Sequence, residues 1–250
     1  MKIVVATKVV FDDQDIFTSA DGSLDYSKAR QIISTYDLNA IEAAAKIAEA
    51  NDGTQVVAVS AATTKADDAK VKKDILSRGL DELFMATDDA LETADSYATA
   101  QVLKGLIEAK AADYDLILCG DGSADFYAGQ VNVQLAAALD VPVINNVTGI
   151  EIADGKAVVE RTFDDEVEEV EVPLPAVVAV SPDIALPRIP GMREILAAGK
   201  KPSAVEAAGA FETKTAIEEI KAPELAPRKN QMFEEGDIDA FAAAITEALK

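Results

Sequence analysis

Short apolar runs alternate with amphipathic patterns of helical spacing along residues 1–140. The runs typical of buried strands lie at residues 2–7, 55–60, 82–86 and 116–119. The helical patterns lie at residues 36–51, 66–77, 96–109 and 131–139. Strands that alternate with helices are joined by right-handed crossovers, so this order predicts an α/β fold with a mostly parallel sheet between two layers of helices. We expect Asp37 to cap the first helix.

The hydrophobic period changes after residue 146. Polar and apolar residues alternate over residues 147–152, 157–163 and 167–172, which predicts an antiparallel hairpin inserted at 147–172. A last buried strand is expected at 176–180. The acidic run at 164–169 could indicate a metal site. The alternation instead favours a solvent-facing strand surface for most of these carboxylates.

The last part of the chain has a different composition. Six of the nine prolines follow residue 180, which predicts an extended C-terminal arm. Residues 233–249 regain a helical stripe that consists of Ile238, Phe241, Ile245 and Leu249. Such a helix either packs on a partner, which we prefer, or folds back on its own domain. The chain thus divides into an α/β domain, 1–185, and an arm, 186–250.

The stretch 115–131 carries the strongest candidate chemistry. Its apolar strand ends at Gly120, a loop of small and polar residues follows, and a helix begins at Val131. Loops at the C-terminal ends of parallel strands face the ligand crevice, and a helix N-terminus offers unpaired N–H groups to an anion. We therefore expect a phosphate site here. Gly120 and Gly122 match neither common phosphate motif, so a tight strand exit without a ligand remains the alternative.

Composition removes several classes of function. The chain has no histidine and one cysteine, Cys119, which excludes disulfides within the chain, His/Cys metal clusters and histidine-based triads. A formal net charge of −22 argues against binding to nucleic acid or to an anionic membrane. The first apolar run is too short for a signal peptide, and nowhere do ~18 apolar residues follow one another, so we expect a cytoplasmic protein without membrane insertion. Four cations at 188–201 form either a docking patch or scattered surface charges.

Several segments together resemble the β subunit of electron-transfer flavoproteins. Residues 36–43, Tyr-Asp-Leu-Asn-Ala-Ile-Glu-Ala, resemble the family segment N-P-Y-D-x-N-A-x-E-A, and Lys8 resembles a lysine after its first strand. Cys119-Gly120, Asp125 and Gln130-Val131 resemble the family loop C-G-x-x-x-x-D-G-D-T-x-Q-V-G, although Phe126-Tyr127-Ala128 replaces G-D-T. Residues 188–201 resemble the partner-recognition segment. Details at 21–25, 76–79 and 120–127 look most like Fix-type bacterial members.

This resemblance implies a Rossmann-like, adenine-nucleotide-hydrolase-like fold and a heterodimer. An α subunit would carry the redox FAD, and this chain would bind AMP or, in electron-bifurcating members, a second FAD. The implied partners are the α subunit, on which the arm would pack, and an acyl-CoA dehydrogenase-type donor or a reductase, contacted through Arg188, Met192 and Ile195. The implied nucleotide-binding residues are Ala6, Ser34, Thr35, Tyr36, Asp37, Ala61, Cys119, Gly120, Gly122, Ser123, Ala124, Asp125, Ala128, Gly129, Gln130 and Val131. Within this set, Asp125 would accept from a ribose hydroxyl or fix the loop.

Three functions remain open at this point. The first is an electron carrier with AMP in this chain, and the second is an NADH-oxidising bifurcating enzyme with a second FAD. The third is a stress-type ATP-binding regulator, although its G-x₂-G-x₉-G-[ST] loop is missing. No catalytic residue and no metal ligand is identified. We favour the carrier, because a flavin performs its own redox chemistry without a catalytic side chain.

Overall fold

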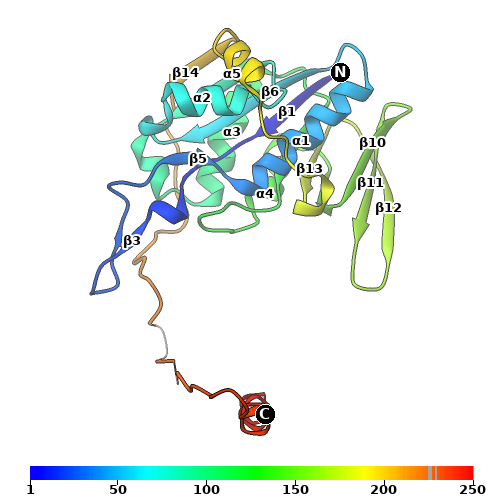
Figure 1. The fold of residues 1–250 in the computed structure, drawn as a ribbon. Helices are drawn as coiled ribbons and strands as arrows, with labels where there is room; N and C mark the ends of the chain where they lie inside the picture. The colour runs from blue at the N-terminus through cyan, green and yellow to red at the C-terminus, as the bar shows by residue number, and fades with distance from the viewer. Residues whose placement is uncertain (225–226, 229, 250) are drawn as a thin grey trace.

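The computed structural model describes residues 1–224, 227–228 and 230–249, and its centre is a seven-stranded sheet (Figure 1). The strand order is β14-β7-β6-β1-β8-β13-β9, and every pairing is parallel. The strands are β1 (Lys2–Ala6), β6 (Gln55–Ala62), β7 (Glu82–Thr87), β8 (Leu116–Gly120), β9 (Val143–Val147), β13 (Ala176–Val180) and β14 (Ser203–Ala207). The predicted α/β fold with a mostly parallel sheet is confirmed.

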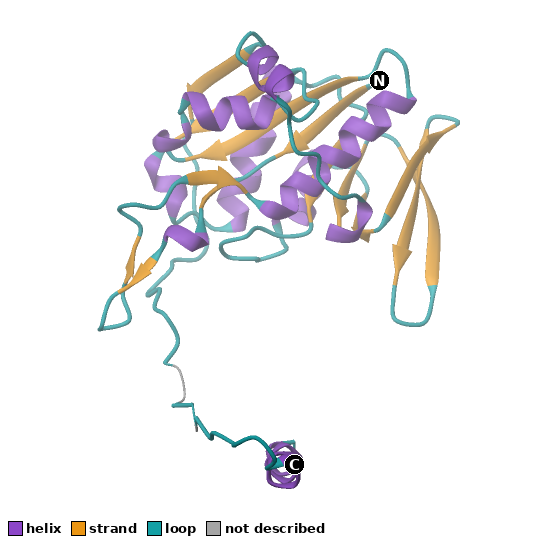
Figure 2. Cartoon of the chain, viewed as in Figure 1, coloured by secondary structure: helices purple, strands orange, loops and turns teal. Residues whose placement is uncertain are grey.

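Helices cover both faces of this sheet, as Figure 2 shows. They are α1 (Thr35–Ala50), α2 (Ala69–Leu76), α3 (Ser96–Lys110), α4 (Val131–Leu139) and α5 (Met192–Ala198). Along β1, Ile3 and Val5 pack into one core with α1 and α2, and Val4 and Ala6 pack into the other with α3 and α4. Alternate residues of a strand point to opposite faces, so this apolar strand serves two buried layers.

A three-stranded antiparallel sheet lies beside the parallel one (Figure 1). It consists of β10 (Gly149–Ala153), β11 (Lys156–Thr162) and β12 (Val167–Pro173). The predicted antiparallel element is present, but it begins at Gly149, because Val147 belongs to β9 of the main sheet. Within the described ranges, no cluster of acidic, cysteine or histidine side chains is arranged to hold a metal ion.

Short strands lie between β1 and α1, and 3-10 turns lie in the loops between the longer elements. They are β2 (Val9–Phe11), β3 (Phe17–Thr18), β4 (Leu24–Asp25) and β5 (Gln31–Ile33), with 3-10 turns η1 (Asp13–Asp15), η2 (Thr64–Ala66), η3 (Asp89–Glu92) and η4 (Pro182–Ile184). β2 pairs with β5 and β3 with β4, both antiparallel. This agrees with the turn-rich composition of residues 11–28.

The segment predicted as an arm contributes an edge strand to the main sheet. β14, which the sequence did not predict, pairs with β7 from Ser203 to Ala207. Beyond it the chain is extended, and α6 (Ile238–Ala248) stands apart from the body (Figure 1). The predicted stripe on α6 is exposed, so in this chain the helix does not fold back. No helix in the described ranges has the length and apolar content that a bilayer span requires.

Candidate functional site

A cavity of about 380 Å³ lies where β1, β6 and β8 end, between the N-termini of α3 and α4. We call it the strand-end cavity. Its lining includes Ala6, Thr7, Lys8, Asp37, Ala61, Thr93, Ala94, Asp95, Ser96, Thr99, Leu103, Cys119, Gly120, Asp121, Gly122, Ser123, Phe126, Ala128, Gly129, Gln130, Val131, Asn132, Thr215 and Ile217. The C-terminal edge of a parallel sheet is the usual place for a ligand in α/β proteins.

The structure brings most of the sequence-predicted residues together around this cavity. Eleven of them line it: Ala6, Asp37, Ala61, Cys119, Gly120, Gly122, Ser123, Ala128, Gly129, Gln130 and Val131. Ser34, Thr35, Tyr36, Ala124 and Asp125 are not in the lining. Ser34 and Asp125 instead brace the loop, because the Ser34 hydroxyl accepts from the Ala124 N–H at 3.2 Å and the Asp125 carboxylate accepts from the Ser123 hydroxyl at 2.5 Å.

Asp37 ties three elements together at the cavity floor. Its carboxylate accepts from the backbone N–H of Lys8 at 2.7 Å and from that of Gly120 at 3.1 Å. The expectation that Asp37 caps α1 was wrong, because the helix begins at Thr35 and leaves Asp37 inside its first turn. Burial raises the pKa of Asp37 to about 7, against the two N–H donors and the Lys8 charge, which lower it.

An ion pair fixes the loop over the cavity. The Lys8 ammonium lies 2.6 Å from the Asp125 carboxylate and 5.1 Å from the centre of the Phe126 ring. Burial alone would raise the pKa of Asp125, but the Lys8 charge and the hydrogen bonds from Lys8, Ser123 and the Phe126 N–H hold it below its ordinary value. Asp125 therefore fixes the loop, one of its two expected roles.

Close packing explains two glycines of the loop. A Cβ atom on Gly120 would lie 2.7 Å from the Tyr36 Cβ, and one on Gly122 would overlap the Tyr127 ring. Tyr36 and Tyr127 in turn contact each other, with ring centres 4.9 Å apart. These glycines let the loop fold tightly onto the start of α1. The same glycines can therefore serve both a tight turn at the strand end and a ligand site.

The N-terminus of α4 offers hydrogen-bond donors to the cavity. The side chain of Gln130 does not cap the helix, and the backbone N–H groups of residues 129–132 find no acceptor within the described part of the chain. Free N–H groups at the start of a helix carry a partial positive charge and suit an anion. Lys8 is the single basic side chain among the described residues that line the cavity.

Asp121 and Cys119 add two polar groups, the first half-buried and the second buried. One Asp121 carboxylate oxygen accepts from the Tyr127 hydroxyl at 3.3 Å, while the other is buried and has no partner among the described residues. Burial raises the pKa of Asp121 and also that of the Cys119 thiol. A thiol with a raised pKa is a poor nucleophile.

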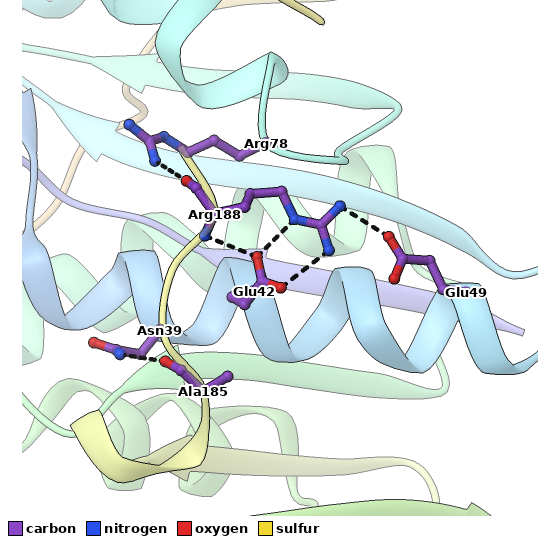
Figure 3. A network of polar contacts seen from close by, with 6 residues as sticks. All are labelled: Asn39, Glu42, Glu49, Arg78, Ala185 and Arg188. Atoms are coloured by element: carbon purple, nitrogen blue, oxygen red, sulfur yellow. Dashed lines mark hydrogen bonds and ion pairs between the residues drawn. The ribbon is translucent and has the colours of Figure 1, made fainter. Parts of the chain in front are cut away.

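The predicted docking residues lie on a second surface, which we call the docking loop, residues 186–196. Met192 and Ile195 are exposed there, and Ile189 is 93 % exposed. Arg188 differs, because its guanidinium is paired with carboxylates of the same chain (Figure 3). It donates to Glu42 at 2.6 and 3.1 Å and to Glu49 at 2.8 Å. Its carbonyl accepts from Arg78 at 2.9 Å, so Arg188 anchors the loop on α1.

Several lining residues were not among the predicted nucleotide-binding residues. Thr7 and Lys8 follow β1 directly, so the rule that selected the loop after β8 also applies to them. Asp95 accepts from the Ala98 N–H at 2.9 Å, a helix cap that an aspartate before a helical pattern indicates. Thr215 and Ile217 arrive from beyond β14, and no local pattern marks them.

A comparison with protein-family models gives an independent match. Residues 22–210 match the electron transfer flavoprotein domain. The matched region contains most of the sheet, the loop from β8 to α4 and the docking loop, and it ends shortly after β14.

Proposed function

The chain belongs to the electron transfer flavoprotein domain family, and on that premise we propose that it is the β subunit of a heterodimeric electron-transfer flavoprotein. In this proposal the chain binds AMP in the strand-end cavity. It also supports the FAD that an α subunit mainly carries. The two subunits together shuttle electrons between an acyl-CoA-type dehydrogenase and an acceptor, as Fix-type members would.

The observation that carries the nucleotide assignment is the set of unpaired polar groups around the cavity. The free N–H groups of residues 129–132 suit a phosphate, and the Lys8 ammonium, although paired with Asp125, adds positive charge at the cavity. The unpartnered Asp121 oxygen suits a hydroxyl or amino donor, and buried polar groups normally have such a partner. The residues present therefore fit an adenine nucleotide.

The size of the cavity is sufficient for a mononucleotide such as AMP. Ligand pockets usually have volumes of roughly 300–1,000 Å³. At about 380 Å³ the strand-end cavity is near the lower end of that range, which is enough for a mononucleotide. A second FAD would need additional room beyond the described lining.

The part played by this chain is binding and orientation. A bound flavin supplies the one- and two-electron redox chemistry. The side chains around the cavity hold a ligand: Asp37 fixes the floor, Asp125 fixes the loop, and α4 presents its N–H groups. Away from the cavity lining, the exposed apolar side chains of the docking loop suit contact with a redox partner.

The experiment is to co-express the chain with its α subunit, purify the complex, denature it and identify the released nucleotides. One FAD and one AMP per heterodimer support the carrier with AMP. Two flavins per heterodimer support the bifurcating alternative instead. A chain that purifies without an α subunit and without any nucleotide contradicts the proposal.

A further inference from the structure

The chain beyond β14 returns to the strand-end cavity. Residues 213–217, which we call the strap, follow an extended stretch that is tied to the sheet where the Ala208 N–H donates to the Thr87 carbonyl at 2.9 Å. Two residues of the strap, Thr215 and Ile217, line the cavity. The strap therefore forms one of its walls.

Asp95 holds the strap in place. One of its carboxylate oxygens accepts from the backbone N–H of Lys214 at 2.6 Å, from that of Thr215 at 2.8 Å and from the Thr215 hydroxyl at 3.3 Å. The other oxygen caps α3 through the Ala98 N–H at 2.9 Å. Burial opposes the charge of Asp95, but these N–H donors hold its pKa below the ordinary value. Hydrogen bonds to a charged acceptor are stronger than neutral ones.

Among the described residues, few other contacts hold the strap. The Lys214 ammonium pairs with Glu212 at 2.8 Å and lies 5.2 Å from the centre of the Tyr97 ring, and both interactions are on the surface. Ile217 is 40 % exposed. A segment with few buried apolar contacts opens more easily than a core element. One carboxylate oxygen thus accounts for most of its polar attachment.

We propose that the strap is a movable wall of the strand-end cavity, that Asp95 is the positioning residue that closes it, and that strap closure and adenine-nucleotide binding stabilise each other. This inference rests on the proposed nucleotide site. Coupling between two binding events is reciprocal, so a ligand that contacts the closed wall also slows its opening. Because the strap leads into the segment that carries α6, an occupied cavity restrains the start of that segment as well.

Two substitutions separate the strap contact from the helix cap. Asp95→Asn keeps one carbonyl oxygen for Ala98 and presents an NH₂ group to the N–H donors of the strap. Asp95→Ser keeps a good capping hydroxyl but is too short to bridge to the strap. Asp88→Asn is the matched control, because Asp88 caps a neighbouring turn through the Ala90 N–H at 2.8 Å and makes no hydrogen bond to the strap.

The test measures hydrogen exchange of the full-length chain by mass spectrometry, with and without AMP, and AMP affinity by calorimetry. In the wild type, AMP is expected to slow exchange of the peptide that contains residues 213–217. In both Asp95 variants this peptide exchanges at least about tenfold faster without AMP, and AMP binds about tenfold more weakly. Asp88→Asn behaves like the wild type. Thermal unfolding of each variant, with a melting temperature close to that of the wild type, shows that the variants fold.

The outcomes distinguish this inference from the proposed function. If AMP binds the wild type and both Asp95 variants equally, or leaves exchange of the strap unchanged, the strap inference is overturned while the nucleotide site stands. If AMP does not bind the wild type, the proposed nucleotide site fails and the inference falls with it.

Discussion

Asp37 accepts a hydrogen bond from the backbone N–H of Gly120, 83 residues further along the chain, at 3.1 Å. The same carboxylate accepts from the Lys8 N–H, so α1 joins the ends of two neighbouring strands, β1 and β8. Both bonded residues line the strand-end cavity. One buried carboxylate therefore sets the relative position of two cavity walls.

The raised pKa of Asp37 makes this joint sensitive to pH. Its folded-state pKa of about 7 exceeds the ordinary value of 3.8, so the folded chain holds this proton more tightly than the unfolded chain. The stabilisation is complete below about pH 4 and is lost as the pH rises to about 7. We expect the wild type to lose up to ~1.4 kcal/mol of unfolding free energy per pH unit relative to Asp37→Asn.

Urea unfolding of both proteins between pH 4 and pH 7 checks this expectation. All other carboxylates are common to the two proteins, so their contributions cancel in the difference. Parallel curves of unfolding free energy against pH would show that Asp37 has an ordinary pKa.

Lys8 is expected to contribute to anion binding. Lys8→Met removes the single basic side chain of the described lining, and we expect the affinity for AMP to fall about tenfold. Lys8→Arg keeps the charge and should bind nearly as the wild type does. Lys2→Met is the control, because Lys2 pairs with Asp113 on the surface. Calorimetric titration with AMP measures all four proteins, and equal affinities would remove Lys8 from the site.

Gly122 is expected to tolerate no side chain. A Cβ atom there would overlap the Tyr127 ring, so Gly122→Ala should displace that exposed ring from Tyr36 and destabilise the fold by ~0.5–1.5 kcal/mol. The control is Gly105→Ala in α3, where an added Cβ meets no atom within 4 Å and helix propensity improves by up to ~1 kcal/mol. Thermal unfolding separates the two glycines. A loss of stability at Gly105 as large as that at Gly122 would argue against the packing explanation.

Met192 is expected to contact the redox partner. It is 71 % exposed on the docking loop, and a flexible apolar side chain adapts to a partner surface. Met192→Glu should leave subunit assembly and flavin content intact and slow electron transfer from the partner dehydrogenase. Met192→Leu keeps an apolar contact and should transfer electrons nearly as fast. Stopped-flow flavin reduction measures both variants, and an unchanged rate in Met192→Glu would show that the docking contact lies elsewhere.

The fold could be predicted largely from local patterns. The helix at 131–139 and the strand at 176–180 occur with the expected bounds, because their apolar spacing is continuous. β14 was missed, because most of its residues are exposed and the strand exists only through pairing with β7. An edge strand with polar neighbours carries a weak periodic signal.

The cavity was only partly predictable for a related reason. Residues after β8 carry a strand, loop and helix pattern, whereas Thr215 reaches the cavity through Asp95, 120 residues away. Nothing in the local sequence of the strap reports that contact. Arg188 is a similar case. Its place in a cluster of cations suggested contact with a partner protein, whereas Glu42 and Glu49, which are distant in sequence, bind its guanidinium.

Phosphate binding at the N-terminus of α4 is tested most directly by titrating the ¹⁵N-labelled chain with AMP and following its amides by NMR, with adenosine as the matched ligand that lacks the phosphate. We expect saturable shifts at the amides of residues 129–132 with AMP, and much smaller shifts there with adenosine. Equal shifts with both ligands, or shifts confined to residues outside the strand-end cavity, would contradict this expectation.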